Sequence, residues 1–385
     1  SWTPLNATSA LLHIVAAATG AIGVGTPLCL DPTYLDASVQ YAASVMRAMA
    51  AASRVPSWCR WLVAPWLKEV RELKGRIRGM EALVGGVMRA RRENGEEAED
   101  LLQWTVDGAA RFGLDAEWKV VRAYLGFVFA AVHSTTVVAT NVLFNLAAMP
   151  PEVTAELRDE MAAALKRHPG GGGGVVTFDA LQDMPKLDSF MKETLRLYPL
   201  QFANFQRKVL KPFSLSTGQL IPASTVIEVP TMAVSLDASR FPHPHRFDPW
   251  RFWRLRTAPG ADPTGHQFAT VAADGTNFGW GRHACPGRWF AANEIKMVVV
   301  AVLGGWDVGM PEEEGGKEGE REREWEGRRW RNWEYGNFVS FACMPPFELF
   351  FFFFRKGGWL NGWMVGCAQC FPVPTRELLF RKIET

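Results

Sequence analysis

A long, weakly charged run from Ala123 to Met149, AYLGFVFAAVHSTTVVATNVLFNLAAM, constrains the fold of this chain strongly. The run is long enough to cross a bilayer, so a membrane span is one interpretation. Polar side chains crowd its middle, where they would be costly in lipid; they are His133, Ser134, Thr135, Thr136, Thr140, Asn141 and Asn145. We therefore expect a helix that is buried inside a large globular domain.

The composition agrees with a globular protein. The chain has 385 residues, of which 48% are hydrophobic, and this is enough for one large domain or two ordinary ones. Its 42 basic and 40 acidic residues leave a formal charge of +2, which predicts no nucleic-acid partner. The 6 cysteines are spread thinly along the chain, and this favours a reducing compartment.

Helical patterns cover most of the chain. Apolar residues recur at three- and four-residue spacing over residues 31–94 and 96–165, as they do in amphipathic helices. Residues 177–197 predict two helices that are broken near Pro185. A further apolar helix is expected from Pro286, because proline suits the first helical turn. The predicted fold class is mainly α with a small β region.

The β region and the loops have their own signals. β-branched residues and a Ser-Thr-Gly turn over Phe213–Pro230 predict a small hairpin sheet. The segment 240–256 is rich in proline and aromatic residues and has no period, so we expect it to be irregular but packed. The glycine run 170–174 and the charged segment 311–331 predict loops.

An apolar segment near the C-terminus, residues 341–369, does not fit a core, since it contains the consecutive phenylalanines Phe350–Phe354. It could bind a partner, dip into a membrane or promote aggregation. We favour translated non-coding sequence from a faulty gene model, because the flanking segments read as halves of one strand-forming terminus. Finding Phe350–Phe354 in the mature transcript would exclude this hypothesis. Cys367 and Cys370 form a lone CxxC with no second pair, which supports neither a zinc site nor a redox site.

The stretch NFGWGRHACPGRWFA places Cys285 in a glycine-rich turn just before a predicted helix. Free backbone N–H groups and the positive end of the helix dipole both stabilise a thiolate there. A nucleophile would need a paired base, and His283 is tied to the same turn without an orienting carboxylate. A metal ligand is the preferred interpretation, and haem iron, which needs one protein ligand on its proximal face, suits a single cysteine better than zinc does.

These residues resemble the haem-binding signature of the cytochrome P450 monooxygenases. Phe278, Gly281, Cys285 and Gly287 match that signature, with His283 where most members have arginine. Two further motifs stand upstream in the family's order: ETLR resembles the E-x-x-R helix, and FDPWRFW resembles the P-x-R-F element. They supply Glu193 and Arg196, and Pro249, Arg251 and Phe252.

The resemblance implies a cytochrome P450 fold with haem b, whose iron takes Cys285 as its axial thiolate ligand. Glu193, Arg196 and Arg251 would form a buried charge network beneath the haem; without the cysteine, Glu193 and Arg196 would read as a surface ion pair. Phe278, Gly281, His283 and Gly287 would bind the cofactor, with Phe278 keeping water from the thiolate. His283 would face a propionate, or else cap the turn.

The long apolar helix resembles the family's oxygen-binding helix. FAAVHSTT lies where the family reads A-G-x-acid-T, with His133 at the acid and Ser134 at the threonine. The hydroxyls of Ser134 and Thr135 would hydrogen-bond dioxygen and relay protons; alternatively, residues 134–136 only bond back to their own helix. The departure at His133 resembles a filamentous-fungal branch that includes ent-kaurene oxidases and the indole-diterpene and gibberellin enzymes.

The family is normally longer at its N-terminus, so we interpret residues 1–385 as one cytochrome P450 domain truncated at that end, with 341–369 as an anomalous insert. The implied function is insertion of one atom of O2 into an apolar small-molecule substrate, a terpenoid or other secondary metabolite, in secondary metabolite biosynthesis. NADPH-cytochrome P450 reductase would supply electrons. The full-length protein would sit in the endoplasmic reticulum membrane, with its anchor absent from this chain.

Two other hypotheses remain at this stage. The chain could be a non-catalytic truncated fragment with impaired haem binding, which the missing N-terminal region supports and the intact motifs oppose. It could also be a membrane or interaction protein that uses residues 123–149 and 350–354 as lipid contacts. The latter would partition into detergent whether or not haem is supplied.

Overall fold

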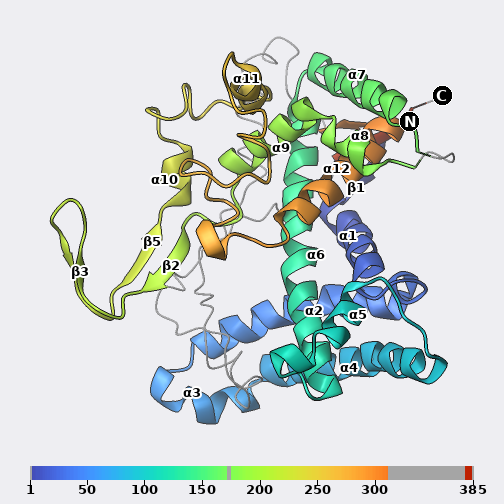
Figure 1. The fold of residues 1–385 in the computed structure, drawn as a ribbon, viewed down its shortest axis with the longest axis vertical. Coiled ribbons are helices and arrows are strands. Elements are labelled where there is room, and N and C mark those ends of the chain that lie inside the picture. The colour runs from blue at the N-terminus through green and yellow to red at the C-terminus, as the bar shows by residue number, and fades with distance from the viewer. Residues whose placement is uncertain (1, 171–174, 311–377, 384–385) are drawn as a thin grey trace. The chain divides into compact units, whose positions relative to one another are not determined.

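The computed structural model describes residues 2–170, 175–310 and 378–383, which divide between two compact units. Among these residues, unit 1 comprises residues 2–8 and those from Val137 onward, and unit 2 comprises Ser9–Thr136. Helices dominate both units, and short strands occur in unit 1 (Figure 1). The predicted fold class, mainly α with a small β region, is confirmed.

Unit 2 is built from helices packed around one apolar core. Its helices are most of α1 (Ala7–Gly23), α2 (Pro32–Ser53), α3 (Ser57–Val63), α4 (Lys68–Asn94), α5 (Leu101–Asp107) and the first part of α6 (Glu117–Ala148), with the short 3-10 helices η1 (Leu28–Leu30), η2 (Ala64–Trp66) and η3 (Ala110–Phe112). Asp31 caps α2 by accepting from the Thr33 amide at 2.7 Å, and α4 ends at Gly95 with a φ of 65°. α2 and α4 lie along one another (Figure 1).

α6 is the predicted long apolar helix. It is the one described helix that is long and apolar enough to cross a membrane, and 72% of its most apolar window is buried. Its polar side chains are buried as well: Thr140 is 0% exposed and Asn145 is 1% exposed. In this structure α6 is therefore a core helix, as predicted. Its residues up to Thr136 belong to unit 2 and those from Val137 to unit 1.

The helices of unit 1 follow the predicted break points with two differences. They are α7 (Pro151–Arg167), α8 (Phe178–Gln182), α9 (Pro185–Leu197), α10 (Thr231–Ser235), α11 (Arg251–Thr257), η4 (Gly281–His283) and α12 (Arg288–Gly305). The segment predicted to be irregular up to residue 256 becomes helical at Arg251, since no proline follows Pro249 there. α12 begins after its N-cap Gly287, so Pro286 precedes the helix instead of starting it.

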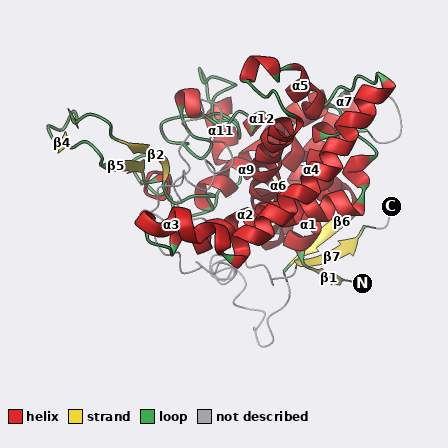
Figure 2. Cartoon of the chain, turned by 90° about the horizontal axis from the view of Figure 1, so that it is seen from below, coloured by secondary structure: helices red, strands yellow, loops and turns green. Residues whose placement is uncertain are grey.

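The strands of unit 1 form small antiparallel sheets. β1 (Thr3–Leu5), β7 (Leu378–Lys382) and β6 (Trp306–Gly309) lie side by side in that order (Figure 2). β3 (Phe213–Ser214) and β4 (Leu220–Ile221) form the predicted hairpin. β5 (Val226–Val229) pairs instead with β2 (Asn204–Lys208), a strand that the sequence did not predict. All of the charged segment 311–331 and all of 341–369 lie outside the described residues.

Candidate functional site

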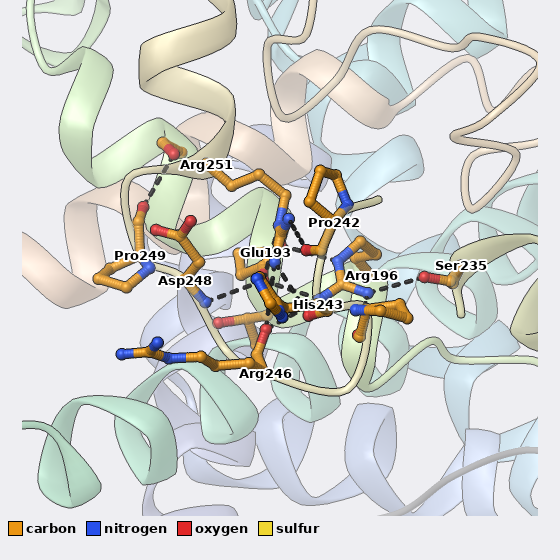
Figure 3. Close-up of polar contacts among 12 residues, drawn as sticks. Glu193, Arg196, Ser235, Pro242, His243, Arg246, Asp248, Pro249 and Arg251 are labelled. Atoms are coloured by element: carbon orange, nitrogen blue, oxygen red, sulfur yellow. Dashed lines mark hydrogen bonds and ion pairs between the residues drawn. The ribbon is translucent and has the colours of Figure 1, made fainter. Parts of the chain in front are cut away.

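α9 buries a carboxylate between two guanidinium groups. Arg196 binds Glu193 through two hydrogen bonds, both of 2.8 Å, and Arg251 Nε lies 3.2 Å from each Glu193 oxygen. Glu193 is 0% exposed and Arg196 2%, so this is not a surface ion pair. Figure 3 shows Glu193 between Arg196 and Arg251, and Asp248 donates its backbone N–H to the same carboxylate at 2.9 Å.

The remaining donors of this network hold an irregular segment in place. Arg196 Nη1 donates to the carbonyls of Ser235 at 2.7 Å and Pro244 at 2.6 Å. Arg251 Nη1 donates to the Pro242 carbonyl at 2.8 Å (Figure 3). A guanidinium carries five donors in a fixed fork, so two arginines can order a proline-rich segment that has no regular hydrogen bonding of its own. The sequence predicted these residues but not their carbonyl partners.

Cys285 lies in a tight turn between η4 and α12. Gly279 has a φ of +81°, and a Cβ there would lie 2.9 Å from the His283 carbonyl oxygen, so the turn requires glycine at this position. The Cys285 N–H donates to the Phe278 carbonyl at 2.7 Å, which closes the turn. The Cys285 thiol is free and half-buried, and Arg288 Nη1 donates to its carbonyl at 2.9 Å.

The other predicted residues of the turn also have definite positions. The Phe278 ring meets Phe268 edge-on, with ring centroids 5.3 Å apart. Gly281 has a φ of +58°, and a Cβ at Gly281 or Gly287 would meet no atom within 4 Å. The exposed His283 accepts a hydrogen bond at Nε2 from Arg282 Nε at 3.2 Å. The turn is thus packed on the Phe278 side and unobstructed at two of its glycines.

The predicted oxygen-helix residues lie on the unit 2 part of α6. Ser134 donates to the Ala130 carbonyl at 2.5 Å and Thr136 to the Val132 carbonyl at 2.7 Å, so both bond back to their own helix. Thr135 is 3% exposed, and its hydroxyl forms no hydrogen bond with any other described residue. These residues belong to unit 2 and Cys285 belongs to unit 1.

His133 is engaged within unit 2. Its Nε2 lies 3.1 Å from the Val39 carbonyl oxygen of α2, so that nitrogen carries the proton. Burial lowers the pKa of His133 below its ordinary value, although the hydrogen bond to Val39 partly opposes this. A neutral imidazole that donates to a backbone carbonyl therefore occupies the position expected for the family's acidic residue.

A second buried charge cluster escaped the sequence analysis. Asp188 of α9 contacts Lys296 Nζ at 2.7 Å and Arg256 Nη1 at 3.1 Å. One turn along α9, Lys192 Nζ donates to the carbonyls of Gln267 at 2.7 Å and Thr270 at 3.1 Å. The sequence signal for this cluster was an acidic and a basic residue four positions apart on a predicted helix. In the structure, the residues of that helix from Leu187 to Leu197 are all buried. That spacing alone resembles an ordinary exposed pair.

The buried Lys192 leads to a prediction about how the stability of the protein changes with pH. Burial lowers the pKa of Lys192 from 10.5 to about 8, while Asp188 and Asp274 partly oppose the shift and Arg256 adds to it. Between pH 8 and 10.5 the unfolded chain holds a proton that the folded protein has lost, so stability rises with pH by about 1.4 kcal/mol per unit. We expect Lys192→Met to remove this rise, measured by urea unfolding at a series of pH values.

The control is Lys166→Met, which removes an exposed charge from α7. It should leave the alkaline rise in place. An equal slope in wild type and Lys192→Met would show that Lys192 stays protonated throughout this pH range.

Comparison with known proteins covers most of the chain. The sequence profile of the family described as Cytochrome P450 matches residues 5–322. Cytochrome P450 monooxygenase ATR3 of Stachybotrys chlorohalonatus is 35% identical, over 80% of this chain and 66% of its own length. Cytochrome P450 monooxygenase braC of Annulohypoxylon truncatum is 32% identical over 80% and 61%, and cytochrome P450 monooxygenase gliF of Aspergillus fumigatus is 34% identical over 81% and 63%. The chain therefore spans 61–66% of the length of these relatives.

Proposed function

Because this chain belongs to the cytochrome P450 family, we propose that the whole protein is a haem-thiolate monooxygenase and that Cys285 is its iron ligand. The observation that carries the proposal is a free, half-buried thiol in a glycine turn ahead of α12. Among the described residues, no group of three or more His, Cys, Asp and Glu side chains could hold a metal ion. A lone thiolate therefore suits a metal that brings its other ligands with it.

The turn fits haem b at Cys285. Bound there, the haem would supply the activation of dioxygen, which amino-acid side chains do not perform. Phe278, Gly281, His283 and Gly287 would border it, and no described atom lies within 4 Å of where a Cβ would stand at Gly281 or Gly287. Phe278, fixed by Phe268, would exclude water from the sulfur.

Proton delivery falls to α6 in this proposal. Thr135 is the preferred hydroxyl, because Ser134 donates to the Ala130 carbonyl and would have to break that bond to donate elsewhere. His133 is held as a donor to Val39, which suits it to positioning the helix more than to carrying protons. Ser134 would pass a proton on through a water molecule after its bond to the Ala130 carbonyl breaks.

The reaction proposed for the whole protein balances as follows. One oxygen atom of O2 enters a C–H bond of an apolar substrate, and the other leaves as water with two protons. NADPH supplies the two electrons through NADPH-cytochrome P450 reductase. The fungal sources of the relatives and the resemblance at His133 support a terpenoid or other secondary metabolite as substrate. Residues 1–385 would act as a single domain, with 341–369 as an insert.

The test of this function is the absorption spectrum of the purified chain, reconstituted with haem, reduced and exposed to carbon monoxide. Thiolate ligation predicts a strongly red-shifted Soret band. Haem that binds with an unshifted band would contradict the proposal. A chain that takes up no haem would favour the hypothesis of a non-catalytic fragment. The same spectrum, recorded on a chain extended at its N-terminus, would then show whether part of the haem-binding region was missing or whether the assignment of Cys285 as the iron ligand is wrong.

We also propose that the protein lies against a membrane. For the whole protein, this would be the membrane of the endoplasmic reticulum. α3 and η2 expose a tryptophan patch, consisting of Trp58 at 80%, Trp61 at 63% and Trp66 at 74%. No acidic residue occurs over residues 37–68. Amphipathic indole rings favour the membrane–water interface, and a segment without acidic residues approaches anionic lipid without repulsion.

The patch can be tested by binding to vesicles that contain anionic lipid. Replacing Trp58, Trp61 and Trp66 by serine should lower the partition coefficient by at least about tenfold, because it removes three large exposed apolar side chains from the interface. Trp104→Ser is the matched control, since Trp104 is also exposed, at 58%, but stands on α5. Equal binding of the triple variant and wild type would rule out this surface.

A further inference from the structure

Asp188 joins three segments of unit 1 at one carboxylate. From α9 it contacts Lys296 of α12 at 2.7 Å. Its other oxygen accepts from the Phe268 backbone N–H at 2.8 Å and from Arg256 at 3.1 Å. Asp188 is 5% exposed and Lys296 3%. Buried charges with direct partners hold their geometry tightly, because any displacement leaves a charge uncompensated.

Two of these segments reach Cys285 by short paths. Before the cysteine, the Phe268 ring packs edge-on against Phe278, whose carbonyl accepts the Cys285 N–H at 2.7 Å. After the cysteine, α12 begins at Arg288 and carries Lys296 two turns further on. The carboxylate of Asp188 thus restrains the chain on both sides of the turn. Lys192, one turn along α9, adds bonds to the carbonyls that flank Phe268.

The two networks on α9 both reach α11, through Arg251 and Arg256, and otherwise hold different parts of the chain. Glu193 and Arg196 bind carbonyls and side chains of the segment 235–251. Asp188 and Lys192 bind the segment 267–270 and α12. We propose that Asp188 is a positioning residue for the Cys285 turn. It fixes Phe278 ahead of the thiol and α12 behind it, and in this way sets where the sulfur lies. The inference rests on the proposed function, in which that sulfur is the iron ligand.

The first variant is Asp188→Asn, which keeps the shape and an acceptor for the Phe268 N–H but removes the charge that faces Lys296 and Arg256. In the haem-free chain, we expect backbone hydrogen exchange in peptides covering residues 276–288 to quicken by about tenfold relative to α7, since the restraint on both sides of the turn is weakened. The matched control is Asp307→Asn. Asp307 also binds two arginines, Arg158 at 2.9 Å and Arg381 at 2.7 Å, but it lies on β6.

The second variant keeps the test decisive if Asp188→Asn does not fold. Asp188→Leu combined with Lys296→Met removes both charges of the ion pair. It also removes the acceptor for the Phe268 N–H. It leaves no uncompensated charge at position 296, and it should show the same selective exchange over 276–288. After haem reconstitution, both variants should show a larger share of haem without the red-shifted Soret band, whereas Asp307→Asn should match wild type.

Equal acceleration in 276–288 and α7, or exchange at the wild-type rate in both Asp188 variants, would overturn the proposal. The two failures are separable. A wild-type protein whose haem lacks the red-shifted band contradicts the proposed function, while the exchange comparison in the haem-free chain still decides whether Asp188 positions the turn.

Discussion

The Cys285→Ala variant is expected to lose the red-shifted Soret band of the reduced, carbon-monoxide-bound protein completely. That band reports a thiolate on the iron, and alanine has no donor atom. The turn itself should survive, because the bond that closes it comes from the Cys285 backbone N–H to the Phe278 carbonyl. Arg288 likewise binds the backbone carbonyl of residue 285. Loss of the band at unchanged helical content would therefore isolate the contribution of the sulfur.

Cys59→Ala is the matched control for this experiment. Cys59 is also free and half-buried, but it lies on α3 with its thiol 3.5 Å from the Pro56 carbonyl. The control should keep the full band. A band that persists in Cys285→Ala would mean that another cysteine supplies the thiolate, and the assignment of the ligand would be wrong.

Local features of the sequence predicted the helices well. The polar residues in the middle of Ala123–Met149 pointed to a core helix, and α6 buries Thr140 and Asn145. Pro185 marked the start of α9 because proline fits a first helical turn. Strand pairing was harder to predict from the sequence. β1 pairs with β7 from the opposite end of the chain, Thr3 against Phe380, and no local pattern specifies such a partner.

The candidate site shows the same contrast between local features, which the sequence predicted, and contacts between distant segments, which it did not. Motif spacing brought Glu193, Arg196 and Arg251 to attention, but a motif names residues and not the carbonyls of residues 235–246 that the arginines bind. Asp188 escaped because its partner Lys296 lies on a helix far along the sequence. His133 was predicted to stand at an acidic position, yet its bond to Val39 depends on how α2 packs against α6.

The Glu193→Gln variant is expected to lower the free energy of unfolding by about 3–5 kcal/mol, because removing one partner of a buried ion pair leaves the other charge uncompensated. Here two guanidinium groups would be affected, since Arg196 and Arg251 are both buried. Glutamine can accept hydrogen bonds but cannot neutralise either group. Urea unfolding followed by circular dichroism would measure the loss.

The control is Glu81→Gln, whose partner Arg122 lies 3.0 Å away with both side chains about a quarter exposed. Solvent screens this pair, so the expected loss is about 1 kcal/mol or less. The comparison separates burial from charge, because both substitutions remove one carboxylate that binds arginine. A loss for Glu193→Gln no larger than that for Glu81→Gln would mean that water or a rearranged neighbour replaces the carboxylate. The segment 235–246 would then not depend on the network for its order.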